Sequence, residues 1–141
     1  MSARSRMHTA EHILSAVMRL HYHAPRNLEF HLNDKKTKCD YEVPGDFGDR
    51  DIRQIESLVN AEIARNHLVT SFVLKRDDAG GYDLWKVPEN AQEIRIFKIG
   101  DFDAQPCGGP HVSSTAEIGR FEISSYEKRE NGRVRIRFKV D

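Results

Sequence analysis

The segment that decides the fold is Arg133-Val134-Arg135-Ile136-Arg137-Phe138-Lys139-Val140, which alternates strictly between cationic and apolar residues. Successive side chains of a β-strand point to opposite faces, so the alternation predicts a strand with one charged face and one apolar face. Such strands are typical of antiparallel sheets that pack one face on a core and leave the other in water. The rest of the chain should therefore supply a layer that covers the apolar face.

Two segments have the apolar spacing of helices that cover a sheet. The first runs from about residue 6 to residue 20 after a capping Ser5, and the second begins at Asp46 or Asp49 and ends near Asn66. Further strands are predicted at residues 27–32, 37–43, 69–75, 82–87, 94–99 and 117–124, with a hairpin turn at 33–36. This order predicts an α+β fold in which two main helices pack on one antiparallel sheet.

The composition is typical of a single globular domain, here spanning residues 1–141. The 22 basic and 22 acidic residues cancel, so any surface that binds nucleic acid has to be local. No apolar run approaches the roughly 18 residues of a membrane helix, and no signal peptide is evident. We therefore expect a cytoplasmic protein without a membrane or DNA partner, whose two cysteines are free thiols.

Two pairs of metal-binding residues stand at opposite ends of the chain. His8 and His12 are four residues apart on the first helix, where one helical face brings both imidazoles together. Cys107 and His111 have the same spacing, but two glycines between two prolines place them on a tight loop. One thiolate and three imidazoles are ligands that zinc prefers, so the four residues predict a Zn2+ site.

The two histidines belong to a polar stripe that the first helix carries beside its apolar face. Ser15 and Arg19 continue this stripe at steps of three and four residues. The apolar face consists of Met7, Ala10, Leu14, Val17 and Met18. We expect the helix to pack on the core with one side and to present functional groups with the other.

A closed set of four protein ligands is usual for structural zinc, whereas catalytic zinc keeps a position for water. Hydrolysis at this site needs a weak or displaced ligand, a fifth coordination position, or a neighbouring group that activates water. Water bound to zinc has a pKa of about 7. Because the Cys107 thiolate weakens that effect, the site suits an activated substrate such as an ester better than a peptide bond.

Glu11 opens a second interpretation of the histidine pair. Residues 8–12 match the H-x-x-E-H pattern of inverted zinc metallopeptidases, in which the glutamate is the general base. No third carboxylate ligand stands out, however, and Cys107 and His111 already offer the remaining ligands. The simpler interpretation is that Glu11 is solvated or accepts a hydrogen bond from a ligand histidine.

Five segments carry a family resemblance. They are residues 8–14 (HTAEHIL), 55–60 (IESLVN), 98–102 (KIGDF), 107–112 (CGGPHV) and 115–119 (TAEIG). Together they resemble the editing domain of alanyl-tRNA synthetase and its freestanding relatives, the alanyl-tRNA editing proteins of the AlaX type. The resemblance spans nearly the whole chain without a synthetase catalytic module, so it implies a minimal editor that acts in trans.

The resemblance implies hydrolysis of the ester that joins a wrong amino acid, typically serine and sometimes glycine, to the alanine tRNA. Serine adds only a hydroxyl to alanine, and an apolar pocket rejects such an analogue poorly, so a second site has to remove it. By matched position, the resemblance implies the same zinc ligands, namely His8, His12, Cys107 and His111. The residue that reads the hydroxyl should come from the hairpin facing the ion, with Asn33, Thr37 and Cys39 as candidates. Cys39 fits a packed core thiol as well.

Pro110 departs from the alanyl pattern, which usually has threonine before the last histidine. The resulting Gly-Pro-His run resembles the related threonyl-tRNA synthetase editing domain, and both branches remove serine. Editing of seryl-tRNA for threonine is therefore one alternative. A non-catalytic module that contains zinc and binds tRNA is another.

A tRNA substrate needs local cations that contact its phosphates. The alternating strand offers four on one face, namely Arg133, Arg135, Arg137 and Lys139. A solvated strand face opposite a core face explains the same pattern without tRNA. A second candidate cluster near the hairpin tip consists of Lys35, Lys36 and Lys38.

Overall fold

The computed structural model describes residues 2–33 and 35–141, so Asp34 of the predicted hairpin turn lies outside the described residues. The helices and strands are α1 (Ala3–Tyr22), β1 (Glu29–Leu32), β2 (Thr37–Glu42), α2 (Asp49–Ala64), β3 (Val69–Lys75), β4 (Glu93–Ile99), β5 (Asp103–Pro106), β6 (Phe121–Lys128) and β7 (Arg133–Val140). Short 3-10 turns are η1 (Arg76–Asp78), η2 (Thr115–Ile118) and η3 (Glu130–Gly132). The predicted α+β class with two main helices is confirmed. No helix within the described ranges is both long and apolar enough for a membrane crossing.

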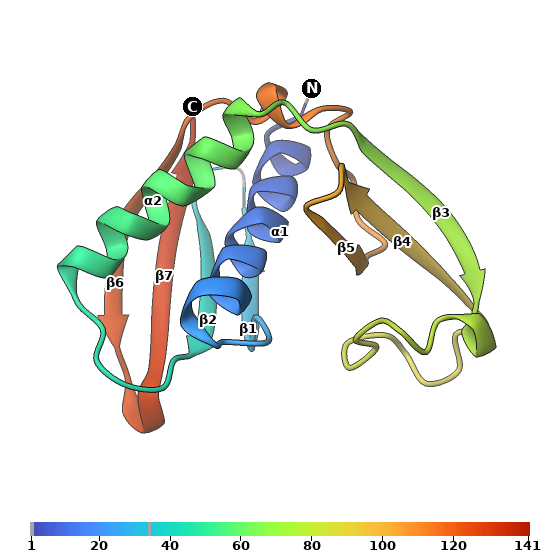
Figure 1. Cartoon of the computed structure of the whole chain (residues 1–141), viewed down its shortest axis with the longest axis horizontal. Coiled ribbons are helices and arrows are strands. Elements are labelled where there is room, and N and C mark those ends of the chain that lie inside the picture. The colour runs from blue at the N-terminus through green and yellow to red at the C-terminus, as the bar shows by residue number, and fades with distance from the viewer. Residues whose placement is uncertain (1, 34) are drawn as a thin grey trace.

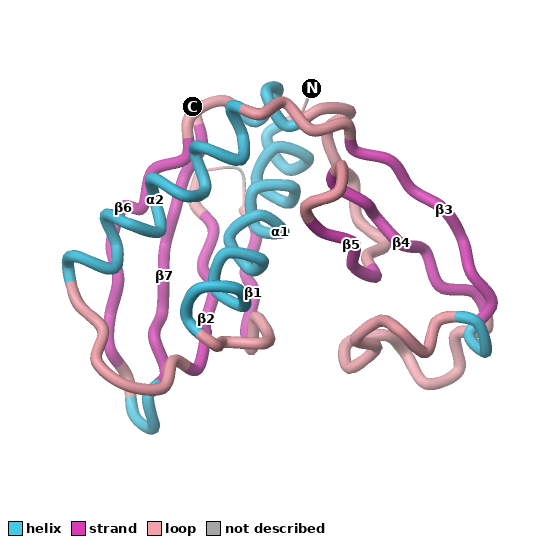
Figure 2. The backbone as a smooth tube through the Cα atoms, in the orientation of Figure 1, coloured by secondary structure: helices cyan, strands magenta, loops and turns pink. Residues whose placement is uncertain are grey.

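The strands form two antiparallel sheets, whereas the sequence pattern predicts one. The larger sheet has the order β1-β2-β7-β6, and the smaller has the order β3-β4-β5. In Figure 1, α1 and α2 cover one face of the larger sheet, and the smaller sheet lies beyond α1. The tube in Figure 2 shows the same division, with the loop that precedes β4 running below the smaller sheet. The prediction of one sheet is therefore wrong, because the alternation of a segment indicates a strand but does not say which strand it pairs with.

The main core lies between the larger sheet and the two helices. Strand β7 is inside this sheet, between β2 and β6, and its apolar residues Val134, Ile136 and Phe138 are buried as predicted. The predicted apolar face of α1 is buried too, with Met7, Ala10, Leu14, Val17 and Met18 all at 2% exposure or less. The helix begins three residues earlier than predicted because Ser2, not Ser5, is its cap: the Ser2 hydroxyl accepts from the Ser5 amide at 3.1 Å.

The smaller sheet has a core of its own, and this core explains one difference from the predicted elements. The predicted strand at residues 82–87 is a looped segment instead, closed by bonds from Tyr82 N to Ala79 O and from Val87 N to Leu84 O. Its apolar side chains pack against Ile94 and its neighbours, so they alternate without belonging to a sheet. The edge strand β5 was not expected, and β6 starts at Phe121, later than predicted, because η2 precedes it.

The charged face of β7 is formed as predicted, and each cation on it has a carboxylate partner. Arg133 and Arg135 donate to the fully buried Asp40 at 2.9 and 2.8 Å. Arg137 pairs with Glu127 at 2.6 Å, and Lys139 pairs with Glu122 at 3.6 Å. Burial raises the pKa of Asp40, but the hydrogen bonds from the two arginines outweigh it, and the net pKa is lowered.

Asp40→Asn should therefore destabilise the protein by about 1–3 kcal/mol at neutral pH, because two arginines lose their buried acceptor. A lowered folded-state pKa adds stability that is fully present above the ordinary pKa of 3.8 and is lost as pH falls below it. Urea unfolding of both proteins at decreasing pH should show the difference shrinking in acid. Glu122→Gln, which removes a half-exposed pair, is the control and should change little. An equal loss at every pH would contradict the charge-based account.

Candidate metal centre

The structure brings the four predicted metal ligands together. His8 and His12 extend from the first half of α1, and Cys107 and His111 come from the loop that follows β5. Their ligand atoms all lie within 4.8 Å of one another, and Cys107 Sγ lies 3.1 Å from His8 Nε2. Residues about 100 positions apart thus form one Cys/His cluster that is able to hold a metal ion.

Thr9 connects the loop after β5 to helix α1 through hydrogen bonds of its hydroxyl group. Its buried hydroxyl donates to Ser5 O at 2.8 Å and accepts from Val112 N at 3.1 Å. His111 Nδ1 lies 3.2 Å from the same oxygen, and since the hydroxyl proton is already used, we assign the proton of this bond to Nδ1. That tautomer leaves His111 Nε2 unprotonated, which is the form a metal ligand needs.

An unpaired ring nitrogen of His111 supports metal binding by the cluster. His8 Nδ1 and His111 Nε2 are buried and have no hydrogen-bond partner among the described residues. An unpaired buried polar atom costs about 1–3 kcal/mol, and an ion between the rings removes this cost at His111 Nε2. The rings converge, with centroids of His8 and His12 at 4.6 and 4.7 Å from that of His111. The donor set of one sulfur and three imidazoles fits Zn2+.

The two cysteines differ sharply in their ionisation. Burial opposes ionisation of Cys107, but hydrogen bonds with His111, His12 and His8 outweigh it and lower the pKa of this thiol to about 3. Burial raises the pKa of Cys39 well above its ordinary value. Both are free, as predicted. Cys107 is therefore a thiolate at neutral pH, the form that binds metal, whereas Cys39 is a neutral packed thiol.

Gly109 allows the loop to approach the helix closely. A Cβ atom at this position would lie 2.1 Å from His8 Cε1 and 2.4 Å from His8 Nδ1. At Gly108 the same atom would meet nothing within 4 Å. The second glycine of the loop is thus required by the position of the His8 ring.

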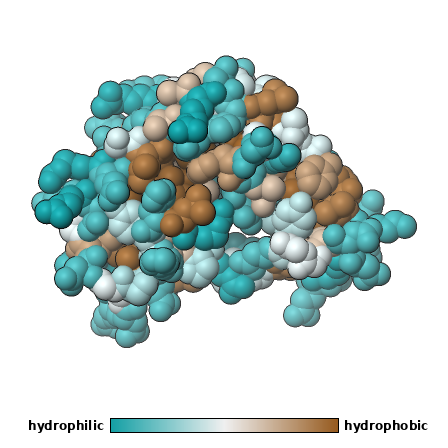
Figure 3. Space-filling view, viewed as in Figure 1, coloured by the Kyte–Doolittle hydropathy of each residue, from teal (hydrophilic) through white to brown (hydrophobic). Residues whose placement is uncertain are grey.

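A cavity of about 500 Å³ opens beside the cluster, between α1 and the smaller sheet. Figure 3 shows that the surface is hollowed between the larger sheet with its helices and the smaller sheet. His8, His12, Cys107 and Gly108 line this cavity, but His111 does not, so the cavity meets the cluster from one side. All four residues of the predicted polar stripe line it, because Ser15 and Arg19 extend the row of histidines.

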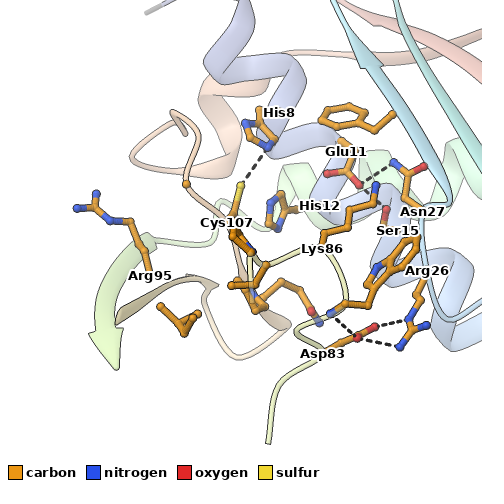
Figure 4. A pocket seen from close by; sticks show the side chains of 18 of the residues that line it. His8, Glu11, His12, Ser15, Arg26, Asn27, Asp83, Lys86, Arg95 and Cys107 are labelled. Carbon is orange, nitrogen blue, oxygen red and sulfur yellow. Dashed lines mark hydrogen bonds and ion pairs between the residues drawn. The ribbon is translucent and has the colours of Figure 1, made fainter. Parts of the chain in front are cut away.

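Glu11 forms a polar wall of the cavity with Ser15 and Asn27 (Figure 4). Glu11 Oε2 accepts from Ser15 Oγ at 2.6 Å and from Asn27 Nδ2 at 3.1 Å. Ser15 Oγ also lies 2.7 Å from the hydroxyl of the buried Tyr41. The carboxylate is therefore held by hydroxyl and amide donors, and no described histidine donates to it. The sequence gives no sign of this role for Asn27, which lies in the segment between α1 and β1.

The three predicted pocket residues lie elsewhere in the structure. Asn33 holds the hairpin turn, where its side chain accepts from the amides of Lys35 and Lys36. Thr37 and Cys39 are fully buried in β2, on the core side of the sheet. None of the three lines the cavity among the described residues, and the hairpin residue that does is Phe30. Lys38 pairs across the sheet with Arg137.

The fold and the site together define an α+β domain with a Cys/His cluster that is able to hold a metal ion at one end of a cavity. Residues 94–137 match the family described as threonyl and alanyl tRNA synthetase second additional domain. The chain is also similar to alanine–tRNA ligases over most of its length. It is 33% identical over 121 residues to that of Nitrosomonas europaea and 30% identical over 138 residues to that of Borrelia hermsii.

These alignments cover 82% and 94% of the chain but only 14% and 23% of the two ligases. The alanine–tRNA ligase of Carboxydothermus hydrogenoformans is 34% identical, again over 84% of the chain and 14% of the ligase. The chain thus corresponds to less than a quarter of each relative. The resemblance to the editing domain of alanyl-tRNA synthetase is confirmed.

Gly109→Ala should weaken zinc affinity roughly 10- to 100-fold, because the new methyl group displaces a ligand ring. Gly108→Ala is the matched control and should bind zinc as the wild type does. Competition with a chromophoric chelator measures both affinities, and circular dichroism checks that both variants fold. Equal affinities for the two variants would exclude His8 as a ligand in this position.

Proposed function

We propose that the chain removes a wrong amino acid from tRNA by hydrolysing its ester, at a zinc ion held by His8, His12, Cys107 and His111. The proposed substrates are seryl-tRNA for alanine and, second, glycyl-tRNA for alanine. The observation that carries the proposal is the convergence of the four ligand atoms within 4.8 Å at one end of a cavity. The similarity of most of the chain to alanine–tRNA ligases supports the choice of tRNA.

Zinc bound by these residues supplies Lewis-acid chemistry suited to an ester carbonyl. The protein contributes the orientation of the ligands: Thr9 fixes the His111 ring, and Gly109 leaves space for the His8 ring. Since His8, His12 and Cys107 line the cavity and His111 does not, an aminoacyl ester approaches along the side of the three lining residues.

The polar wall beside the cluster is the proposed binding site for the aminoacyl group. An ammonium group next to Glu11 gains a charge-assisted bond, and the carboxylate is already oriented by Ser15 and Asn27. The same wall offers an amide and a hydroxyl that are able to bond a serine side chain. Glu11 thus acts as a substrate-binding carboxylate in this proposal, where the metallopeptidase alternative makes it a general base.

The proposal predicts that the zinc-loaded protein releases serine from seryl-tRNA for alanine. Cys107→Ala should abolish both zinc binding and release, since it removes the thiolate ligand. Cys39→Ala, at a buried thiol outside the cavity, should retain both. Zinc content by mass spectrometry and release of radiolabelled serine measure the two properties.

The same assay separates the alternatives. Stoichiometric zinc without ester hydrolysis would favour a non-catalytic tRNA-binding module. Faster release from the threonine tRNA than from the alanine tRNA would favour the threonyl branch that Pro110 resembles. Cleavage of a peptide that depends on Glu11, with seryl-tRNA left intact, would favour the metallopeptidase.

The contact between tRNA and the charged face of β7 stays a prediction, and the ion pairs there define its test. A phosphate has to replace a carboxylate at each of those cations. At the cavity, Arg19 and Arg26 are paired, whereas Lys86 and Arg95 form no ion pair with any described residue.

We expect a Lys86→Ala/Arg95→Ala double variant to weaken tRNA binding more than Arg137→Ala/Lys139→Ala. Each lost phosphate contact should lower the slope of binding against salt by about 1. Filter binding at several salt concentrations measures both effects. A larger loss in the β7 variant would place the tRNA on the sheet face.

A further inference from the structure

The end of the cavity away from the metal cluster carries an exposed aromatic side chain, Trp85. Its surface is 44% exposed, although it lines the same cavity as the metal ligands. Phe30, the other aromatic ring of the described lining, lies against His8 with centroids 5.6 Å apart and so belongs to the metal end. Figure 4 shows Arg26 and Asp83, the neighbours of Trp85, on the side opposite His8 and Cys107.

The Trp85 ring is held in place despite its exposure. Asp83 accepts from the Trp85 amide at 3.2 Å and from Arg26 Nε and Nη2 at 2.7 and 3.0 Å. The Arg26 guanidinium carbon lies 5.0 Å from the ring centroid, and Lys86 Nζ lies 5.3 Å from it. Two cations and a bidentate ion pair thus position a large planar surface that faces solvent at the cavity.

The chemistry of an aminoacyl-tRNA places a purine near any ester bound at the cluster. The amino acid is esterified to the ribose of the terminal adenosine, so the base of that nucleotide is attached to the same sugar as the reacting ester. A cavity of about 500 Å³ is within the range of pockets that enclose whole small ligands, which leaves room beyond the aminoacyl group. The base therefore has to lie in or beside this cavity.

We propose that Trp85 is the stacking platform for the terminal adenine of the tRNA, with Lys86 placed near the phosphate of the same nucleotide. The proposal rests on the proposed function and adds the binding site for the nucleotide end of the substrate. Exposed aromatic rings beside cations are a common way to bind unpaired bases. Stacking of one base contributes a factor of roughly 5 to 150 in affinity.

Trp85 is the single tryptophan of the chain, so its fluorescence reports directly on this site. The zinc-loaded protein is titrated with the trinucleotide cytidylyl-cytidylyl-adenosine and with the same molecule lacking the terminal base. Saturable quenching by the first probe alone supports the proposal, whereas equal responses or no response to both overturn it. Phe72→Ala removes another exposed aromatic, on β3 and outside the cavity, and should quench as the wild type does. The readout needs no hydrolysis, so it decides the proposal even if the esterase activity fails.

A second experiment compares seryl-tRNA with serine ethyl ester, which lacks the nucleotide. Trp85→Ala should raise KM for seryl-tRNA roughly 5- to 150-fold and leave hydrolysis of the ethyl ester unchanged, and Trp85→Phe should lose less. An equal loss on both substrates would show that Trp85 only supports the fold and would overturn the proposal. Wild-type protein that hydrolyses neither substrate would refute the proposed function, while the fluorescence titration would still stand.

Discussion

Helix α1 lies beside α2 and packs between the two sheets (Figure 1). Its apolar face packs against β1, β2 and β7 of the larger sheet, while its other side contacts β5 of the smaller one. The hydroxyl of Thr9 binds the loop after β5 to the helix backbone. Because Thr9 stands between His8 and His12, its hydrogen bond with Val112 also sets the distance from these histidines to the loop that carries Cys107 and His111. A substitution that shifts the helix would therefore disturb both the core and the metal cluster.

A metal ion with four protein ligands needs an open side to take part in a reaction. His12 is buried and Cys107 is half-buried, and both line the cavity with His8, whereas His111 does not line it. The cluster thus meets the cavity through three of its four residues, next to the carboxylate of Glu11. The cavity continues from the cluster past the polar wall to Trp85, an order that corresponds to the ester, the amino acid and the nucleotide of an aminoacyl-tRNA.

Periodicity identified the parts of the structure that depend on local sequence. The alternation of residues 133–140 gave the correct buried and charged faces, and the spacing of His8, His12, Ser15 and Arg19 gave the row that lines the cavity. Long-range pairing was harder to predict. Residues 82–87 alternate because they cover a small core as a loop, and their side chains give no information about a strand partner. Asn27 was missed for a similar reason, since its role depends on the position of Glu11 in the folded chain.

The central claim is that one sulfur and three imidazole nitrogens hold a single zinc ion. X-ray absorption spectroscopy of the zinc-loaded protein measures this coordination directly. The account predicts one sulfur at about 2.3 Å and three nitrogens at about 2.0–2.1 Å. A spectrum with oxygen and nitrogen ligands alone in the wild-type protein would contradict it.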